Sequence, residues 1–582
     1  MHGNYPNSRI HSPGLVLTDE RSQERDLDVF PIPDRSLIDY EKYHQFVGHA
    51  GVKYSVAVQA TRGCPYRCFY CDIYKTTKFH FRRSDEHLFR EIDKLYDCGI
   101  RRIEFIDDIF NVNWKGFKRF FEYVIRKNYK FQFFFPTGLK GDLLTKELID
   151  LMVEGGSVGV NLSLEHASPR MQKVMRKGLD VDKLRENLDY ITGKYPQVVL
   201  TLNAMHGFPT ETEEEAEETL KFILETEWID FAYLHNVRIF PGTELEHFAL
   251  EVGVPEEIIR ASQDMSYHEL SPTLPFSKEF TEGIRVRFLR DYVFNKNRLK
   301  DRIKNQLTVF SRDELDQRYN AYFPSKSIVT LDDVLKIARI KLEDVLPEKA
   351  FDESTVKPID INTAFSNAFK REHSTAPEKD GEVKFKLLLI DLSSYYEDSN
   401  NLREYNVLEP PLGLMALQTY LAEKLGPCLE TMIIKSRMDF NSSKELYQIV
   451  TSFSPNLIGI RAMTFYKGLL HDSVRELREL GVTTPIFCGG PYPTASYNEI
   501  VFDRNIELVC VGEGETTLLD VVRSMMSNNF QLPDESALVS IPGLAFFSDR
   551  LSSPRVHDPD DWKKILMPKR KKDQGESNIS FG

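Results

Sequence analysis

Residues 60–71 read Ala-Thr-Arg-Gly-Cys-Pro-Tyr-Arg-Cys-Phe-Tyr-Cys, and the spacing of the three cysteines in this stretch predicts a metal centre. Cys64, Cys68 and Cys71 can curl around one cuboidal iron–sulfur cluster, because soft thiolates suit iron–sulfur chemistry. Three ligands leave one iron of such a cluster open to a substrate or a cofactor. A structural zinc site normally needs a fourth ligand, for which His80 is the only nearby candidate. The spacing therefore favours a cluster over zinc or chance.

The pattern Cys-x-x-x-Cys-x-x-Cys, with the aromatic Tyr70 before the last cysteine, resembles the radical S-adenosylmethionine (SAM) superfamily. The resemblance implies a 4Fe-4S cluster on Cys64, Cys68 and Cys71, with the methionine end of SAM on the open iron and Tyr70 near the adenine. It also implies that an electron from the reduced cluster splits SAM into methionine and a 5′-deoxyadenosyl radical. The implied fold is a full or partial barrel of parallel βα units.

The chain around and after the cysteines alternates between strand and helix patterns, as such a barrel requires. The patterns predict strands over 54–60, 101–106, 158–164, 198–205 and 231–239, and helices over 85–96, 146–154 and 213–224. We therefore predict an α/β fold with a partial (βα)6-type barrel over 51–250. Its site should lie at the carboxyl ends of the strands.

Polar residues follow the predicted strands, and taken singly each of them also fits a helix cap. The order of these residues along the chain resembles the order of the SAM-binding motifs of the superfamily. The resemblance implies SAM contacts from Asp107, Asp108, Glu165, Asn203, Gly207 and Pro209. Pro241-Gly242-Thr243 follows the last predicted strand. The family usually has Ser after the glutamate, where this chain has His166. We interpret His166 as a buried histidine at a helix start rather than a catalytic group.

A second α/β pattern begins at residue 384. Apolar runs predict strands over 384–390, 457–460, 485–488 and 508–511, and the sequence Pro-Pro-Leu-Gly-Leu at 410–414 opens a helix that runs to residue 424. Short apolar strands with helices between them predict a doubly wound, Rossmann-like domain. Glycines after successive strands let the backbone approach a large flat or phosphate-bearing ligand, although turns need glycine as well.

As a series, these segments resemble the cobalamin-binding domain of cobalamin-dependent radical SAM enzymes over 384–525. The resemblance implies cobalamin contacts from Pro411, Gly413, Gly459, Met463, Thr464, Gly489, Gly490, Gly512, Glu513, Gly514, Glu515 and Thr516. Folds that hold cobalt through histidine carry Asp-x-His-x-x-Gly after the first strand, where this chain reads Ile-Asp-Leu-Ser-Ser-Tyr at 390–395. The domain's only histidine is His471 on a later helix, so we expect no histidine on the cobalt.

The order of the modules is unusual, because the cobalamin domain usually precedes the barrel. Ser-Pro-Gly-Leu-Val at 12–16 is similar to Ile-Pro-Gly-Leu-Ala at 541–545, and in the usual order such a hairpin closes the cobalamin domain. We interpret this as a circular permutation or a fragment of a tandem array, with chance similarity as the alternative. The predicted domains are an N-terminal extension or linker (1–50), the barrel (51–250), a helical cap or substrate region (251–350), a linker (351–383), the cobalamin-binding-like domain (384–530) and a hairpin with a polar tail (531–582).

The composition narrows the class of protein. The chain has 75 basic and 88 acidic residues, which argues against nucleic-acid binding as its main function, and we expect its basic cluster at 569–572 to be a solvated tail. No apolar stretch is long enough to span a membrane and no secretion signal opens the chain, so we expect a cytoplasmic protein. Seven cysteines, four of them isolated, are too few for a secreted disulfide framework.

Together these patterns favour cobalamin-dependent C-methylation of an unactivated carbon in a natural product or peptide. The expected cofactors are a 4Fe-4S cluster, SAM and cobalamin, and the expected electron donor is a flavodoxin or ferredoxin. One alternative is a radical SAM enzyme that rearranges, dehydrates or cyclises its substrate without methyl transfer. Another is a corrinoid or redox sensor without catalysis. A methylthiotransferase is disfavoured, because no second set of cluster cysteines precedes Cys64.

Overall fold

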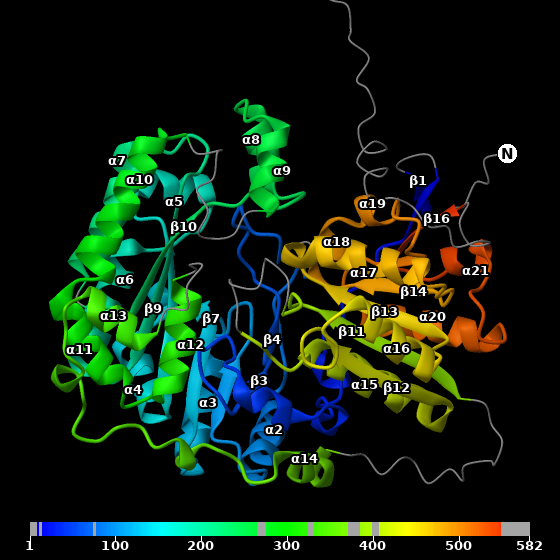
Figure 1. Ribbon diagram of the computed structural model, residues 1–582, viewed down its shortest axis with the longest axis horizontal. Helices are drawn as coiled ribbons and strands as arrows, with labels where there is room; N and C mark the ends of the chain where they lie inside the picture. The colour runs from blue at the N-terminus through cyan, green and yellow to red at the C-terminus, as the bar shows by residue number, and fades with distance from the viewer. Residues whose placement is uncertain are drawn as a thin grey trace, which may run out of the picture.

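The computed structural model describes residues 8–10, 14–73, 77–226, 228–264, 275–323, 330–369, 384–397 and 407–548. Two large β-sheets, each with its own helices, lie side by side (Figure 1), and the short strands β4 (Thr61–Arg62) and β5 (Phe81–Arg82) form a third sheet. The basic cluster at 569–572 lies outside the described residues. Across the described ranges, no helix combines the length and the apolar character needed to cross a bilayer.

The first sheet has six strands in the order β10-β9-β8-β7-β6-β3, and all neighbours in it are parallel. Its strands are β3 (Ser55–Val58), β6 (Arg102–Phe105), β7 (Gln132–Leu139), β8 (Ser157–Glu165), β9 (Val199–His206) and β10 (Phe231–Asn236). The connecting helices are α2 (Asp85–Asp97), α3 (Trp114–Arg126), α4 (Lys146–Glu154), α5 (Pro169–Met175), α6 (Val181–Lys194) and α7 (Glu213–Glu225). The order in space follows the order along the chain, which confirms the predicted partial barrel.

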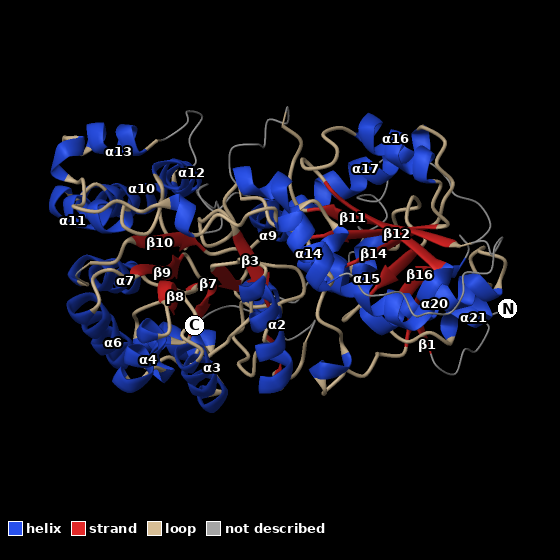
Figure 2. Ribbon diagram, turned by 90° about the horizontal axis from the view of Figure 1, so that it is seen from below, coloured by secondary structure: helices blue, strands red, loops and turns tan. Residues whose placement is uncertain are grey.

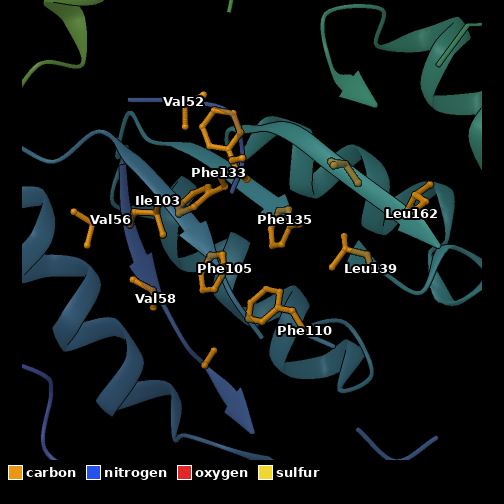
Figure 3. Packing of buried hydrophobic residues seen from close by; sticks show 14 of the residues in the cluster. Val52, Val56, Val58, Ile103, Phe105, Phe110, Phe133, Phe135, Leu139 and Leu162 are labelled. Carbon is orange, nitrogen blue, oxygen red and sulfur yellow. The ribbon is translucent and has the colours of Figure 1, made fainter. Parts of the chain in front are cut away.

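Strand β7 and helix α3 were not among the predicted elements. The start of β7 reads Gln-Phe-Phe-Phe, a continuous apolar run without the alternation that marks a half-buried strand. Figure 3 shows Phe133 and Phe135 packed with Phe105 and Phe110, and the Phe105 ring centroid lies 5.5 Å from that of Phe135 and 4.4 Å from that of Phe110. This aromatic core supports the strand ends that carry the candidate site.

Strand β10 ends at Asn236, earlier than predicted, so the segment at 241–243 does not close a strand. Thr243 is instead the N-cap of helix α8 (Glu244–Glu251), and its side chain accepts from the Glu246 amide. This placement makes 241–243 part of a helix start beyond the barrel mouth.

Much of the helical region after residue 250 extends the barrel wall, whereas residues 256–264 contact 464–466 of the second module and Phe276 stacks on His206 at the carboxyl end of β9. Its elements are α9 (Glu256–Asp264), α10 (Lys278–Arg287), the π-helix η5 (Phe288–Val293), α11 (Lys296–Gln306), α12 (Arg312–Tyr322), α13 (Leu331–Ile337) and α14 (Ile361–Phe369). Both α10 and η5 pack against α7, and η5 also contacts β10. From α12, Glu314 forms a buried ion pair with Arg102, the first residue of β6. Helix α12 therefore lies at the amino ends of the strands, opposite the mouth.

Residues 361–369, predicted as part of a linker, form α14. Ile361, Phe365 and Phe369 are buried and lie one helical turn apart, which is the spacing that makes an apolar stripe. The Phe365 ring contacts Tyr40 at 4.8 Å, so α14 joins the N-terminal segment to the barrel.

The second sheet has eight strands in the order β1-β2-β16-β15-β14-β13-β11-β12. Its strands are β1 (Ser8–Ile10), β2 (Leu15–Thr18), β11 (Phe385–Leu392), β12 (Leu429–Lys435), β13 (Leu457–Ala462), β14 (Ile486–Gly489), β15 (Leu508–Cys510) and β16 (Leu544–Phe547). The accompanying helices are α15 (Leu412–Leu425), α16 (Ser443–Phe453), α17 (Lys467–Glu479), α18 (Pro491–Ala495), α19 (Tyr497–Ile500), α20 (Glu515–Ser527) and α21 (Glu535–Val539). Figure 2 shows them on both sides of the strands. The strands β12, β11, β13, β14 and β15 are parallel, with the chain reversing direction across the sheet beside β11. This confirms the doubly wound fold, whose ligand crevice belongs at that reversal.

The N-terminal strands belong to the sheet of the C-terminal module, so the prediction of residues 1–50 as an extension or linker was wrong for 8–10 and 15–18. Strand β2 pairs antiparallel with β16, placing Leu17 opposite Ala545. The Gly543 amide donates to Asp19 O at 2.8 Å and the Ser548 amide to Gly14 O at 2.9 Å. Gly14-Leu15 and Gly543-Leu544, which belong to the two similar segments of the sequence, thus lie at the starts of the paired strands β2 and β16.

Candidate functional site

The three cysteines lie on one loop beyond the carboxyl end of β3. Cys64, Cys68 and Cys71 follow the short strand β4 (Thr61–Arg62), and all three are partly buried. The Cys71 amide donates to Cys68 O at 3.1 Å, so the last two form a tight turn. Among the described residues, no three His, Cys, Asp or Glu side chains surround a single metal position. A cuboidal cluster does not need such a group, because each protein ligand binds a different iron. Three thiols on one loop therefore fit a cluster with one open iron.

Two aspartates at the end of β6 hold this loop. The Asp107 carboxylate accepts from the Ala60 amide at 3.0 Å, from the Thr61 amide, and from the Thr61 hydroxyl at 2.6 Å. Asp108 accepts from the Gly63 amide at 2.9 Å. Asp107 is fully buried, and burial raises its pKa to about 7. These bonds occupy the Asp107 carboxylate, so the geometry assigns it to the cluster loop and does not support our prediction that it contacts SAM.

Gly63 explains why the loop can approach this closely. Its φ is +81°, and a Cβ at this position would lie 2.1 Å from the Phe79 carbonyl oxygen. Only glycine fits a left-handed backbone pressed against another main chain.

Glu165, at the end of β8, lies near Tyr70 and Cys68 of the cysteine loop. Glu165 ends β8 with a φ of 62°, and its carboxylate accepts from the Lys177 ammonium at 2.9 Å. Burial raises the pKa of Tyr70, and the nearby Glu165 charge acts in the same direction. Burial also raises the pKa of the Cys68 thiol, which the neighbouring Lys177 opposes. A left-handed conformation at a non-glycine residue costs roughly 1 kcal/mol or more and is typical of functional sites.

The segment from Gly207 to Pro209 is fixed by a buried carboxylate. The amides of Gly207 and Phe208 donate to Glu211 at 2.6 and 2.8 Å, and Glu211 lies 2.9 Å from His166 Nε2. His166 Nδ1 accepts from the Ser168 amide at 3.0 Å, which places the ring proton on Nε2. His166 is fully buried two residues before Ser168, the N-cap of α5, as predicted for a buried histidine at a helix start.

Asn203 is separated from this group. It lies within β9 and not at its end, and it lines a cavity of about 360 Å³ inside the barrel, which we call the lumen cavity. The inner faces of β7 to β10, the loop 47–51 and Arg318 and Ala321 of α12 complete its wall. Asn203 therefore faces the space where a substrate would lie.

A second cavity of about 380 Å³ lies at the carboxyl ends of β11, β12 and β13, and we call it the crevice. Of the residues predicted to contact cobalamin, Pro411, Gly413 and Met463 line it. The reversal of chain direction beside β11 creates this space, as expected for a doubly wound sheet.

Three charged residues of the crevice were missed by the sequence reasoning. Asp391 bonds the Lys435 ammonium at 2.8 Å and the Arg461 guanidinium at 3.0 Å. Asp391, Lys435 and Arg461 lie at the carboxyl ends of the adjacent strands β11, β12 and β13. A charged residue at the end of each of these strands is the signal that could have identified them. His471 lies elsewhere, with its ring buried between Asp503 and Tyr492. Among the described residues, the only histidine that lines the crevice is His49, from the barrel module.

Several predicted cobalamin residues lie outside the crevice lining. They are Gly459, Thr464, Gly489, Gly490, Gly512, Glu513, Gly514, Glu515 and Thr516. A Cβ at Gly459 would lie 2.7 Å from Leu389 in the sheet, so this glycine serves strand packing. Glu515 pairs with Arg62 at 2.6 Å, and Glu513 lies 3.7 Å from the same guanidinium. Because Arg62 is two residues before Cys64, these acids connect the second module to the cluster loop.

The lumen cavity and the crevice adjoin, since His49 and Val407 line both. His49 donates its amide to Glu409 at 2.6 Å, and its ring lies 3.2 Å from the same carboxylate. Glu409 is also hydrogen-bonded to Glu104 of β6. Glu104 accepts from the Ala50 amide at 3.1 Å and from the Ser55 hydroxyl. The boundary between the two spaces therefore holds two carboxyl groups in contact.

We predict that the stability of the protein falls as pH rises from about 5 to 8 through this pair. Burial raises the pKa of Glu104 to about 8, and burial also raises the pKa of Glu409. An acid whose pKa is higher in the folded than in the unfolded state stabilises the fold at low pH and loses that effect as pH rises through the folded value. The charged groups facing the pair, namely His49, Lys435 and Arg461, do not reverse this direction.

Thermal unfolding of Glu104→Gln between pH 5 and 8.5 tests this prediction. The amide imitates the protonated acid, so we expect the variant to lose part of the decline in melting temperature seen in the wild type. Glu122→Gln, at an exposed position, should retain the whole decline. Parallel curves for Glu104→Gln and the wild type would contradict the assignment.

Comparison with known proteins identifies both modules. The description "Radical SAM superfamily" matches residues 58–223, and "B12 binding domain" matches residues 401–522. The chain is 27% identical over 287 residues to "Uncharacterized methyltransferase PH0819" of Pyrococcus horikoshii, covering 48% of this chain and 59% of that protein. It is 24% identical over 314 residues to a tRNA-2-methylthio-N(6)-dimethylallyladenosine synthase of Sulfurihydrogenibium sp., covering 52% of this chain and 70% of that protein.

Among solved structures, the chain is similar to the radical S-adenosylmethionine methyltransferase TsrM of Kitasatospora setae, solved with cobalamin and a [4Fe-4S] cluster bound. The match has a TM-score of 0.32 and 18% identity, covering 37% of this chain and 42% of that one. The assignment accordingly rests on the two family matches and on the two sheets that carry them. The chain joins a radical SAM domain to a B12-binding domain that follows it, with the 4Fe-4S cluster, SAM and cobalamin as the cofactors that these domains imply.

Proposed function

We propose that this protein is a cobalamin-dependent radical SAM methyltransferase that methylates an unactivated carbon of a small-molecule or peptide substrate. The observation that carries the proposal is the contact between the lumen cavity and the crevice, which share His49 and Val407. A substrate in the barrel would lie next to the cofactor of the second module. The methyltransferase name of the Pyrococcus relative agrees with this reaction.

Some residues of the chain would bind the cluster and SAM, and others would hold the cluster loop in position. Cys64, Cys68 and Cys71 hold the cluster, with SAM beside Tyr70, Glu165 and the segment 207–209. Arg62 is buried to a large extent and tied to Glu515, so the cluster loop keeps its place relative to the second module.

The cobalamin would lie in the crevice, against Pro411, Gly413 and Met463, with Asp391, Lys435 and Arg461 at its floor. The charged side chains of the crevice can hydrogen-bond the amide side chains of cobalamin. The described crevice lining of the second module contains no histidine. We infer that the cobalt is not held by a histidine of that module.

When bound, the reduced cluster supplies the electron that splits SAM, and the cobalamin serves as the carrier of the methyl group. Overall, two SAM and two electrons convert a substrate C–H bond into C–CH₃. The co-products are methionine, 5′-deoxyadenosine and S-adenosylhomocysteine. The electrons would come from a reduced flavodoxin or ferredoxin, and substrate bound in the lumen cavity would exclude water from the radical.

Anaerobic reconstitution with iron, sulfide and cobalamin, followed by desalting, tests the proposal. We expect a corrinoid absorption band to remain with the protein, and SAM plus reductant to yield 5′-deoxyadenosine. SAM cleavage without a retained corrinoid would favour the non-methylating radical enzyme. A retained corrinoid without SAM cleavage would favour the sensor.

Gly413→Phe offers a specific block of the crevice. Gly413 is the second residue of α15, and a Cβ there meets no atom within 4 Å, so the helix can carry a ring that points into open space. We expect this variant to fold and to bind iron normally but to lose at least about tenfold in cobalamin affinity, because the ring fills the site. Gly193→Phe, at an equally open and exposed helical glycine, is the control. Equal corrinoid retention by the two variants would refute the placement.

A further inference from the structure

The lumen cavity contains one permanently charged side chain, Arg318 of α12. Its other lining residues are apolar, aromatic, amide, hydroxyl or histidine side chains, and no Asp, Glu or Lys is among those described. A volume of about 360 Å³ matches the lower end of small-molecule sites. The electrostatics of the cavity are therefore set by this guanidinium.

Arg318 is only partly satisfied by the protein. Its Nη1 donates to Ala50 O at 2.7 Å and its Nη2 to the Thr201 hydroxyl at 3.3 Å, while its Nε is buried and makes no hydrogen bond in the described structure. The guanidinium carbon lies 4.1 Å from the Phe231 ring centroid, which fixes its plane. No carboxylate of the described residues forms an ion pair with it.

The buried arginines of this region show what a structural arginine looks like here. Arg298 donates to four main-chain carbonyls at 2.9 to 3.0 Å, and Arg102 is paired with Glu314. Arg318 has neither arrangement. The neighbouring carboxyl groups of Glu104 and Asp230 form no ion pair with Arg318 in the described structure, and burial raises the pKa of both, which weakens them as counter-charges. Arg318 is partly buried, and withdrawing a cation from water without a counter-charge is unfavourable, so burial lowers the pKa of Arg318.

A second polar group points to the same place. Asn161 of β8 is buried, and its amide nitrogen donates to Pro136 O at 2.8 Å, which fixes the orientation of the amide. The other end, Oδ1, is buried and has no hydrogen-bond partner in the described structure. Asn161 lies directly opposite Thr201, the hydroxyl partner of Arg318, in the β8–β9 register. An unfilled acceptor and an unpaired cation thus occupy the same level of the barrel.

We propose that the substrate carries an anionic group, a carboxylate or a phosphate, that pairs with Arg318, and a neighbouring N–H or O–H group that donates to Asn161. The proposal rests on the proposed function only in taking the lumen cavity as the substrate site. Arg318 enters from the amino ends of the strands, so the anionic end of the substrate lies deepest. The carbon to be modified then lies toward the cysteine loop and the crevice.

Calorimetric titration of the reconstituted, unreduced holoenzyme with SAM present tests this inference without turnover. The probes are 3-phenylpropanoate, its neutral amide 3-phenylpropanamide, and 3-phenylpropyl phosphate, which share one aromatic body and differ in the end group. We expect the better anion to bind at least about tenfold more tightly than the amide, and the stronger of the two anions identifies the group. We expect Arg318→Met to remove the preference and Arg318→Lys to keep part of it.

Three outcomes would overturn the proposal: equal binding of the anions and the amide, an anion preference that survives Arg318→Met, or no binding of any probe up to about 10 mM. Arg298→Met is the matched control, because it removes a buried arginine outside the cavity lining and should leave the preference intact while lowering the melting temperature. If that variant does not fold, the comparison of Arg318→Lys with Arg318→Met still decides the matter. Cobalamin retention and SAM cleavage measured on the same preparations separate a failure of this inference from a failure of the proposed function.

Discussion

Cys68→Ala is expected to abolish cluster binding and SAM cleavage while leaving the fold intact. Cys68 is the middle ligand of the loop, and its amide neighbours are fixed independently of its thiol, since the Phe69 amide donates to Met175 O at 3.1 Å. The loop should therefore persist with two thiols, which cannot retain a cluster that needs three protein ligands. We expect iron content and 5′-deoxyadenosine formation to fall to background.

Iron analysis, visible absorption after anaerobic reconstitution, and thermal unfolding measure the two halves of this prediction separately. Cys428→Ala, at a partly buried cysteine on the second module, should match the wild type in all three. A cluster that survives Cys68→Ala would overturn the assignment of the ligands. If the cluster is lost and the biological effect of the protein persists, the sensor interpretation gains.

Asp107→Ala should give the largest loss of stability of any single change at the site. It would leave the Ala60 amide, the Thr61 amide and the Thr61 hydroxyl buried without their acceptor. Each such group costs about 1–3 kcal/mol, so the three together cost roughly 3–9 kcal/mol. That is a large share of the roughly 5–15 kcal/mol by which a folded domain is stable. We expect a fall of about 10 °C or more in melting temperature, together with loss of iron.

Two matched variants distinguish a loop anchor from a SAM ligand. Asp107→Asn keeps one acceptor oxygen and should recover much of the stability, and Asp108→Ala removes one bond, to the Gly63 amide, and should cost less. SAM affinity measured by calorimetry provides the contrast. A weakened SAM affinity with unchanged stability in Asp107→Ala would restore the role that we first predicted for this residue.

Sequence reasoning reached the fold because its signals are local. The cysteine spacing, the alternation of helices and strands, and the glycine-rich series of the second module all depend on residues close together in the chain. Strand β7 was missed because it is buried on both faces and therefore lacks alternation. The pairing of Glu513 and Glu515 with Arg62 was not predicted, because Arg62 is more than 450 positions away and no local pattern reports such a pairing.

Only those parts of the candidate site that depend on residues close together in the chain could be predicted. Glu165, Tyr70 and the segment 207–209 were found through motif spacing. Arg318 and Glu104 could not be found, because an arginine on an amphipathic helix and a glutamate within an apolar strand are each ordinary in sequence. Their significance arises from the barrel lumen, which forms only when strands distant in the chain close around it.

The pairing of β2 with β16 also limits when the second sheet can form during synthesis of the chain. Thr18 and Leu544 are hydrogen-bonded across 526 positions, so β2 must wait for β16 until 526 further residues have been made. At the usual 5–20 residues per second, that wait is roughly half a minute to two minutes on the ribosome. During it the barrel can fold, while the edge of β2 that β16 will cover remains without its partner strand. We therefore expect codons that slow translation between β2 and β16 to lower the yield of folded protein more than slow codons placed after β16.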